Sequence, residues 1–322
     1  MIGVNCKLLD GNKKTVLITG GFGLLGGRLG QYLCSDYNII LASRFDRNTP
    51  DWLPLSKVVK IDWENEKSLV NVCKSADIII HASGLNSGQC SLNPEKALLV
   101  NGAYTKRLVK AAARQGVKRF IYLSTAHVYS GNMHGIVSEH TATTNKHPYA
   151  TSHVSGEESV LLAASQGLIE GVVVRIANAF GRPVDKDVDC WMLLVNNLCK
   201  QAIIEKSLTL QNHSGISRDF VTIDDFCSAI AFLMRDEKAD GNVVNIGSGE
   251  VLTIGEMTNK VQLVCSKHLG FEPPIINSSI SSQEREVFNF KTDYLDAAGF
   301  EFINNFTREI EDLIVFCQEN FS

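Results

Sequence analysis

The most constraining feature of the sequence is a short apolar run that passes directly into a glycine-rich turn. Residues Thr15–Thr19 (TVLIT) lead into Gly20-Gly21-Phe22-Gly23-Leu24-Leu25-Gly26, and an apolar segment of helical period, Leu24–Ser35, follows. The GxxGxxG spacing allows a tight turn from strand to helix, and backbone N–H groups at the start of such a helix can bind a pyrophosphate. We therefore interpret this segment as the first βα unit of a dinucleotide-binding fold. The alternative is a turn that only packs a strand against a helix.

Strand-length apolar runs alternate with helical segments through the first half of the chain. The runs are Thr15–Thr19, Asn38–Ala42, Val58–Asp62, Asp77–Ala82, Arg119–Ser124 and Gly171–Ile176, and the later helical segments are Lys67–Lys74, Pro94–Gln115 and Tyr149–Gln166. Pro94 suits the first turn of its helix, and Gly116 suits the C-terminal cap. Continuous rather than alternating hydrophobicity indicates strands that are covered on both faces, as in a parallel sheet. Right-handed crossovers then predict an α/β protein with a Rossmann-type, doubly wound parallel sheet over residues 1–177.

The pattern changes from about Asn178. Helical segments near Trp191–Gln201, Ile223–Met234, Ile254–Leu269 and Phe306–Glu319 are separated by polar loops, with a short strand at Asn242–Ile246. We interpret residues 178–322 as a smaller α/β substrate-binding domain, some segments of which return to the Rossmann domain. Its expected place is the carboxyl edge of the sheet, where ligands bind in open α/β folds.

Composition restricts the class of protein. Of 322 residues, 44% are hydrophobic and 20% charged, and the net charge is −4, which gives no basic field for nucleic acid. No apolar run approaches the ~20 residues of a membrane helix. The nine cysteines are scattered singly, which is typical of reduced thiols in a cytoplasmic protein. No metal site and no membrane or nucleic-acid partner is expected.

The ends of the second to fourth strands indicate how a dinucleotide would be held. The second strand ends at Ser43-Arg44, where an NAD-binding chain usually has Asp or Glu for the ribose 2′-hydroxyl. Arg44 beside Ser43 suits the 2′-phosphate of NADP instead, so NADP is favoured and NAD is the alternative. Asp62 suits either the adenine amine or a strand-end turn. The small residues Ala82, Ser83 and Gly84 allow close approach to the cofactor, and the preceding His81 is interpreted as structural.

Five further motifs resemble one family in their order. These are Leu123–Tyr129 (LSTAHVY), Pro148–Glu157 (PYATSHVSGE), Val174–Gly181 (VRIANAFG), Arg218–Asp225 (RDFVTIDD) and Val244–Gly247 (VNIG). Together with the glycine turn, they resemble the extended short-chain dehydrogenases/reductases, and more narrowly the nucleotide-sugar epimerases and reductases. The expected cofactor contacts are then Gly20, Phe22, Gly23, Leu24, Leu25, Gly26, Ser43, Arg44, Asp62, Ala82, Ser83, Gly84, Asn101, Ser124, Tyr149, His153 and Ile176.

The catalytic residues that this resemblance implies include one departure. Tyr149 is the candidate acid/base, because a phenol can exchange a proton with an alcohol or carbonyl oxygen, and Thr125 would polarise that oxygen. The family has a lysine four residues after the tyrosine, where it holds the nicotinamide ribose and favours the tyrosinate. This chain has His153 there, and imidazole is mostly neutral at pH 7. A reductase, in which tyrosine donates a proton, tolerates this change better than an oxidising enzyme.

The substrate side is predicted from the resemblance as well. Family members that remove water carry acidic residues just after the Thr125 position, whereas this chain has Ala126 and His127, so dehydration is disfavoured. His127 would face substrate or hold the loop. Asn178 and Arg218 would meet the diphosphate of a nucleoside-diphosphate sugar, since an arginine fork suits phosphate oxygens. The alternatives are a turn role for Asn178 and an ion pair with Asp219, Asp224 or Asp225 for Arg218.

The family also commonly forms homodimers through two of these helices. The apolar positions available for that seam are Ala97, Leu98, Val109, Ala112, Val160, Leu161 and Ala164, which suit packing on the sheet equally. Our interpretation of the whole chain is an NADPH-dependent reductase of a keto group on a nucleoside-diphosphate sugar. The alternatives are an NAD-dependent nucleotide-sugar 4-epimerase and a non-catalytic dinucleotide-binding regulator, the latter because of His153.

Overall fold

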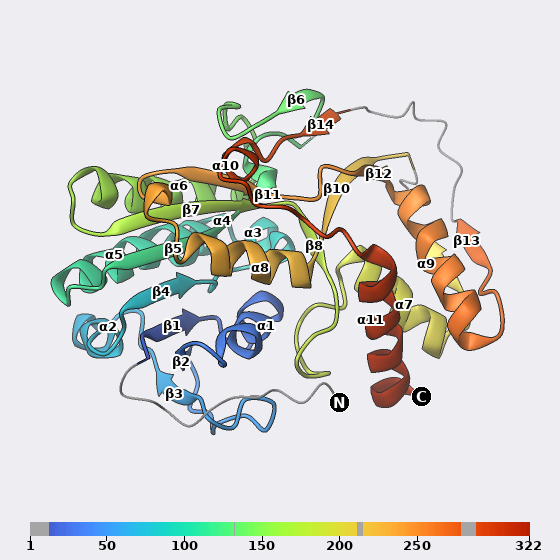
Figure 1. Cartoon of the computed structure of the whole chain (residues 1–322), viewed down its shortest axis with the longest axis horizontal. Helices are drawn as coiled ribbons and strands as arrows, with labels where there is room; N and C mark the ends of the chain where they lie inside the picture. Colours follow the sequence, from blue (N-terminus) through green and yellow to red (C-terminus); the bar gives the residue numbers. More distant parts are fainter. Residues whose placement is uncertain (1–12, 132, 211–214, 278–287) are drawn as a thin grey trace. The chain divides into compact units, whose positions relative to one another are not determined.

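The central sheet of the computed structural model is Rossmann-like. The structure describes residues 13–131, 133–210, 215–277 and 288–322. Seven strands form the sheet in the order β11-β7-β5-β4-β1-β2-β3 (Figure 1). Their bounds are β1 Thr15–Thr19, β2 Asn38–Ser43, β3 Lys57–Lys60, β4 Ile78–His81, β5 Arg119–Thr125, β7 Glu170–Ile176 and β11 Val243–Ile246. The strands from β3 to β7 pair in parallel. The predicted doubly wound sheet is therefore confirmed.

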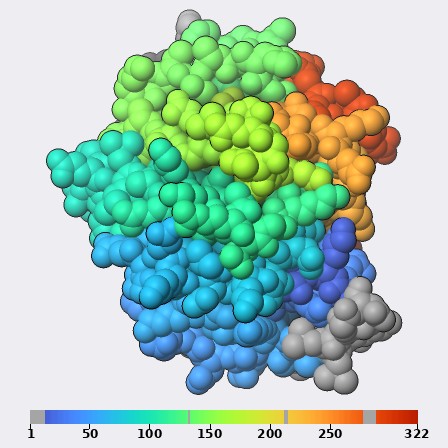
Figure 2. Space-filling view, turned by 90° about the vertical axis from the view of Figure 1, so that its left-hand side faces the viewer, coloured from blue at the N-terminus to red at the C-terminus, as the bar shows by residue number. Residues whose placement is uncertain are grey.

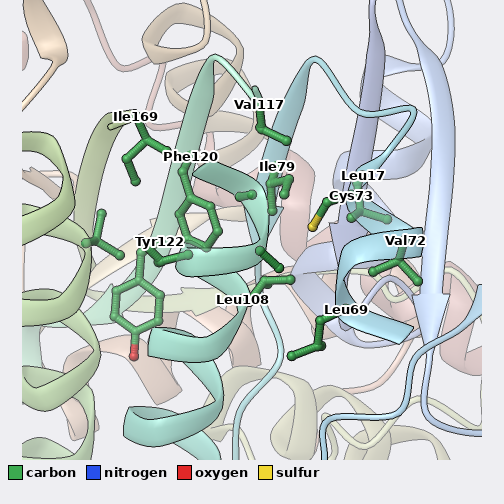
Figure 3. Packing of buried hydrophobic residues seen from close by; sticks show 14 of the residues in the cluster. Leu17, Leu69, Val72, Cys73, Ile79, Leu108, Val117, Phe120, Tyr122 and Ile169 are labelled. Atoms are coloured by element: carbon green, nitrogen blue, oxygen red, sulfur yellow. The ribbon is translucent and has the colours of Figure 1, made fainter. Parts of the chain in front are cut away.

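Helices cover the faces of this sheet, as its buried strands require. α2 (Glu66–Cys73), α5 (Tyr104–Arg114) and α6 (Pro148–Ser165) pack side by side, and α1 (Leu24–Leu33) lies against β1 and β2. Atoms of the α5 and α6 segments lie on the face of the molecule that Figure 2 shows. Beneath the three helices lies a core that includes Phe120 and Tyr122 of β5 and Leu108 of α5 (Figure 3). Burial of such side chains contributes roughly 1.5–3 kcal/mol each.

The segment predicted as one helix over Pro94–Gln115 is divided into three. It consists of α4 (Pro94–Ala97), a π-helical turn (Leu98–Ala103) and α5, and it is preceded by α3 (Ser87–Leu92), which the sequence analysis missed. Pro94 occupies the first turn of α4 and Gly116 has a φ of +71° after α5, as predicted. Asn93 ends α3 and accepts from the Lys96 N–H of α4, so the chain restarts its helix there.

The chain divides into two compact units. The first contains Met1–Gly131, Ala142–Ile176 and Ile230–Val244, and the second contains Asn132–Thr141, Ala177–Ala229 and Asn245–Ser322. α8 (Ile223–Leu233) runs through the boundary between two of these segments. The sheet strands up to β7 and the helices α1 to α6 belong to the first unit.

The second unit has a core and small sheets of its own. β8 (Asn178–Phe180), β10 (Ser217–Thr222) and β12 (Val251–Thr253) form a three-stranded sheet. Two further pairs join β9 (Leu208–Leu210) to β13 (Ile275–Asn277) and β6 (Gly135–Val137) to β14 (Phe288–Phe290). α7 (Leu194–Ile204), α9 (Ile254–Leu269) and α11 (Phe306–Phe321) pack around a second hydrophobic core, and α10 (Asp293–Ala297) completes the unit.

The helices and the cysteines bear on two further predictions from the sequence. Over the ranges described above, no helix is both long enough and apolar enough to span a bilayer. Seven cysteines, from Cys73 to Cys317, are buried free thiols. Cys34 is disulfide-bonded, so the expectation of uniformly reduced cysteines is wrong at this position.

Candidate active site

The glycine turn between β1 and α1 is built for close backbone approach. Gly20 has a φ of +68°, and a Cβ there would lie 2.6 Å from the Ala82 carbonyl oxygen of the β4 loop. A Cβ on Gly26 would collide with the Gly20 carbonyl, and the Gly23 N–H donates to that carbonyl at 2.9 Å. No side chain caps the N-terminus of α1 and no acidic residue lies in its first turn. This cradle fits an anionic pyrophosphate.

A pocket lies beyond the ends of β2 and β3. Its volume is about 680 Å³, and its lining includes Arg44, Lys60, Asp62, Trp63 and Tyr104. The Arg44 guanidinium lies 4.8 Å above the Phe45 ring, and the Ser43 hydroxyl accepts from the Phe45 N–H. The pocket therefore joins cations and aromatic rings in one place, which suits an adenosine phosphate.

Three acidic residues near this pocket, Asp46, Asp62 and Glu64, have hydrogen-bond partners. Asp46 pairs with Lys60 at 2.6 Å. One Asp62 carboxylate oxygen accepts from the Glu64 N–H at 3.0 Å, which is the turn role considered for it. Trp63 stacks on Tyr104, with 5.8 Å between ring centroids, and the Tyr104 hydroxyl donates to Glu64.

The loop after β4 is fixed by Asn101. This buried side chain accepts from the Leu85 N–H at 2.8 Å and donates to the Ser152 hydroxyl of α6 at 3.1 Å. A Cβ on Gly84 would lie 3.1 Å from the Asn101 side-chain oxygen, so glycine permits this approach. Asn101, one of the expected cofactor contacts, thus ties the Ala82–Gly84 loop to α6.

His81 is buried with both ring nitrogens hydrogen-bonded. Its Nδ1 lies 2.6 Å from the Thr19 hydroxyl, and its Nε2 lies 2.9 Å from the Thr105 hydroxyl. Burial lowers the pKa of His81 to about 3, and the neighbouring His153 lowers it further. A neutral imidazole with two partners has the geometry of a structural histidine.

Thr125, Tyr149 and His153 come together at the carboxyl end of β5. Thr125 is the last residue of β5 and pairs in register with Ile176 of β7. Tyr149 lies in the first turn of α6, and a hydrogen bond links its side chain with Thr125. The rings of Tyr149 and His153 meet edge to face with 4.6 Å between centroids. His127 contributes a third ring, 6.3 Å from that of Tyr149.

The protonation states follow from the depth of burial. Desolvation raises the pKa of Tyr149 to about 12, although the hydrogen bond with Thr125 opposes the shift. Desolvation lowers the pKa of His153 to about 4, and the nearby His127 lowers it as well. At neutral pH Tyr149 is therefore a protonated phenol beside a neutral imidazole.

A second tyrosine, Tyr122, contacts the imidazole of His153. The Tyr122 hydroxyl lies 3.0 Å from His153 Nδ1 and 3.4 Å from the Asn101 carbonyl oxygen. Tyr122 is 1% exposed and extends from β5 beneath α6, with its hydroxyl at the end of the buried ring (Figure 3). Tyr122 was not among the predicted site residues. What could have indicated it is a tyrosine among the apolar residues of a strand, because a buried phenol needs a hydrogen-bond partner.

A buried ion pair fixes α6 to the sheet. Arg175 of β7 donates to both carboxylate oxygens of Glu157, at 3.0 Å and 2.6 Å, and both side chains are buried. The Ser124 hydroxyl donates to the same carboxylate. Ser124, expected as a cofactor contact, therefore holds the end of β5 against α6. Glu157 and Arg175 lie inside recognised motifs, but the sequence analysis gave them no role.

The two residues expected to meet the substrate diphosphate, Asn178 and Arg218, lie in the second unit, on neighbouring strands. Asn178 begins β8 and donates from its side chain to the Asp219 carbonyl of β10 at 2.9 Å. Arg218 of β10 is half-buried and donates to the Ser217 carbonyl at 2.9 Å. Asp225 is engaged elsewhere, since its carboxylate accepts from the Ile303 and Asn304 N–H groups.

Asp219 is the unusual carboxyl group of this unit. It is 2% exposed, and one oxygen accepts from the Ser248 N–H at 2.9 Å, while the other has no partner among the described residues. Burial raises the pKa of Asp219 to about 8.

The parallel sheet, the glycine cradle and the Thr125–Tyr149 pair define a protein of the extended short-chain dehydrogenase/reductase class. A model of the "NAD dependent epimerase/dehydratase family" matches residues 16–247, and the chain belongs to that family. Members of the family are enzymes that act on nucleotide sugars.

Individual relatives are distant but extend over most of the chain. The chain is 25% identical over 263 residues to "Uncharacterized UDP-glucose epimerase YtcB" of Bacillus subtilis, covering 77% of this chain and 81% of the relative. It is 27% identical over 250 residues to "dTDP-6-deoxy-L-talose 4-dehydrogenase (NAD(P)(+))" of Kitasatospora kifunensis, covering 74% and 75%. The solved structure of RMD from Pseudomonas aeruginosa complexed with NADPH superposes with a TM-score of 0.78 at 20% identity, covering 95% and 99%.

Proposed function

We propose that the protein reduces a keto group on a nucleoside-diphosphate sugar with NADPH. The observation that carries this proposal is the surroundings of the Tyr149 phenol. Its phenol is held neutral by burial and lies against the Thr125 hydroxyl, with a neutral His153 beside it instead of a cation. Such a phenol is a proton donor over the neutral pH range, as a reduction requires.

The residues of the first unit have separate roles in this reaction. A bound nicotinamide supplies the hydride. Thr125 donates a hydrogen bond to the carbonyl oxygen of the substrate, and Tyr149 donates the proton that the new alcohol needs. His153 holds the ribose by hydrogen bonding, in the place of the family lysine. The cradle of Gly20, Gly23 and Gly26 receives the pyrophosphate through backbone N–H groups.

NADP is the proposed form of the cofactor. Arg44 lines the pocket beyond β2, and Asp46, two residues further along the chain, is paired with Lys60. An arginine guanidinium suits a 2′-phosphate. NAD is the alternative, and the relative from Kitasatospora kifunensis is named for both forms. Asn178 and Arg218 are proposed to receive the diphosphate of the sugar nucleotide, in a cytoplasmic homodimer.

The test is NADPH fluorescence during incubation with a panel of nucleotide-linked 4-keto-sugars, with products identified by mass. We expect NADPH consumption and a product heavier by two hydrogens. Tyr149→Phe keeps the ring and removes the proton, so it should lose at least about 100-fold in turnover. Tight NADPH binding without turnover of any member of the panel would contradict the reductase proposal.

A 4-epimerase is the second candidate, favoured by the name of the Bacillus subtilis relative. An epimerase oxidises and re-reduces one carbon on a retained cofactor, so it would leave purification with NAD bound and would release no oxidised cofactor. The regulator alternative rests on His153. If His153→Lys creates turnover where there was none, His153 marks a lost activity, whereas damage to an existing activity marks an adapted residue.

A further inference from the structure

A chain of buried hydrogen bonds leads from the strand β5 to His153. The Tyr122 hydroxyl has two possible acceptors, His153 Nδ1 at 3.0 Å and the Asn101 carbonyl oxygen at 3.4 Å. The Asn101 carbonyl already accepts from the Thr105 hydroxyl at 2.7 Å. A phenol has one proton to donate, and of the two contacts the one with His153 Nδ1 has the better hydrogen-bond distance.

The direction of this hydrogen bond fixes the tautomer of the imidazole. A neutral histidine carries one proton, on either Nδ1 or Nε2. Burial keeps the pKa of Tyr122 well above its ordinary value, so the phenol retains its proton and acts as donor. If Nδ1 accepts, the imidazole proton must be on Nε2, and among the described residues Nε2 has no hydrogen-bond partner.

We propose that Tyr122 is a positioning residue that fixes the Nε2–H tautomer of His153 and so gives this neutral side chain the donor that the family lysine would supply. The inference rests on the proposed function only in that the ribose of the cofactor accepts the hydrogen bond from His153 Nε2–H. The opposite tautomer would present a lone pair at the same place. A ribose hydroxyl could still donate to that lone pair, but its oxygen would no longer accept a hydrogen bond from His153.

The packing around Tyr122 is shaped for this contact. A Cβ on Gly156 would lie 2.6 Å from Tyr122 Cζ and 2.8 Å from the Asn101 carbonyl oxygen, so only glycine lets the phenol reach the axis of α6. On its other side the imidazole faces the cofactor loop, since a Cβ on Gly84 would lie 4.0 Å from His153 Cε1. His153 therefore lies between Tyr122 and the loop after β4, which contains residues expected to contact the cofactor.

The tautomer is measured directly by long-range ¹H–¹⁵N NMR on protein labelled at histidine, without cofactor or turnover. We expect the Nε2–H pattern for His153 at pH 7, with Nδ1 in the range of a hydrogen-bonded acceptor. Tyr122→Phe keeps the ring and should shift His153 toward a mixture of tautomers, and Gly156→Ala, which displaces the phenol, should do the same. Tyr129→Phe is the matched control, because it removes another buried hydroxyl and should leave His153 unchanged. An Nδ1–H tautomer in the unaltered protein would overturn the proposal, as would a His153 pattern that Tyr122→Phe leaves intact.

A double-mutant cycle on cofactor binding tests the consequence. Tyr122→Phe should raise the Kd for NADPH about threefold to tenfold, the effect of one hydrogen bond. In a His153→Ala background the same substitution should have no effect, because the side chain that Tyr122 orients is gone. An equal loss in both backgrounds would assign Tyr122 a merely structural role. Since binding and the NMR pattern need no substrate, an absent reductase activity would not change either result.

Discussion

At the residue scale, the chemistry of the site is set by the side chains of Tyr149, His153 and His127, whose rings contact one another beside Thr125. Tyr149, with a pKa of about 12, and His153, with a pKa of about 4, are both uncharged between pH 6 and pH 9. A family lysine at position 153 would add a positive charge next to the phenol. Its replacement removes that charge while the hydrogen bond between Thr125 and Tyr149 stays in place.

The first prediction concerns the pH dependence of the proposed reduction. The active form of Tyr149 is protonated, so the rate under saturating conditions should not fall through deprotonation of this group until the pH approaches about 12. Stopped-flow measurement of NADPH oxidation from pH 6 to pH 10 should therefore show no descending limb due to tyrosine. A reductive rate that increases with pH over this interval would mean that the ionised phenol is the active form.

The choice between NADP and NAD is also decided at single residues. Arg44→Ala removes the proposed partner of the 2′-phosphate, so the KM for NADPH should increase about tenfold, the value of one charge-assisted hydrogen bond, while the KM for NADH stays within twofold. Lys67→Ala, on a neighbouring exposed helix surface, is the control for loss of one positive charge. If Arg44→Ala weakens both cofactors equally, Arg44 does not discriminate between them.

Some of these residues were predictable and others were not. Tyr149 and His153 are four positions apart on one helix, so their spacing predicted that these two would meet, and the resemblance to the family implied that Thr125 joins them. Tyr122 acts through a contact between β5 and α6 that depends on the absence of a side chain at Gly156. Asn101 acts on the β4 loop from within a π-helical turn. Neither of these contacts is encoded in local sequence.

At the element scale, the ion pair between Glu157 and Arg175 connects α6, which carries Tyr149, to β7. Glu157→Gln leaves a buried guanidinium without its counter-charge, which should reduce the free energy of unfolding by about 3–5 kcal/mol. Asp46→Asn breaks an exposed pair with Lys60 and should cost less than about 1 kcal/mol. Chemical denaturation of both variants measures the difference. Similar small effects for the two would mean that the buried pair does not stabilise the fold.

The helix over Pro94–Gln115 shows where element prediction reached its limit. Its apolar period is continuous, so sequence indicated one helix with a proline start and a glycine end, and both ends are confirmed. The π-helical turn within it is a tertiary effect: a Cβ on Gly102 would lie 2.8 Å from the Ser155 hydroxyl of α6, so the two helices approach closely there. A pattern of hydrophobicity contains no information on that approach.

At the scale of the whole molecule, the first unit followed from sequence more completely than the second. Its strands are continuous apolar runs joined by helices, and handedness then leaves few topologies. The strands of the second unit, such as β8 and β12, are three residues long and are paired between distant segments. Runs of that length have no distinct period, whereas the helices α8, α9 and α11 were located closely.

The homodimer is the remaining expectation at this scale, and the structure changes where its seam must lie. Ala97, Val109, Ala112 and Val160 are buried within the protomer, so the prediction that they serve the seam is not supported.

The exposed side of these helical segments still carries apolar side chains that a partner could cover. Leu162 of α6 is 56% exposed and Leu98 is 49% exposed. Sedimentation velocity should therefore show a dimer in the unaltered protein. Leu162→Asp should shift it to monomer without lowering the thermal midpoint of a diluted sample, because a charge would then be buried in a two-fold interface. Lys110→Ala, on the exposed side of α5, controls for a general surface change. A monomer at all concentrations would rule out the dimer, and a dimer that withstands Leu162→Asp would place the interface on another face.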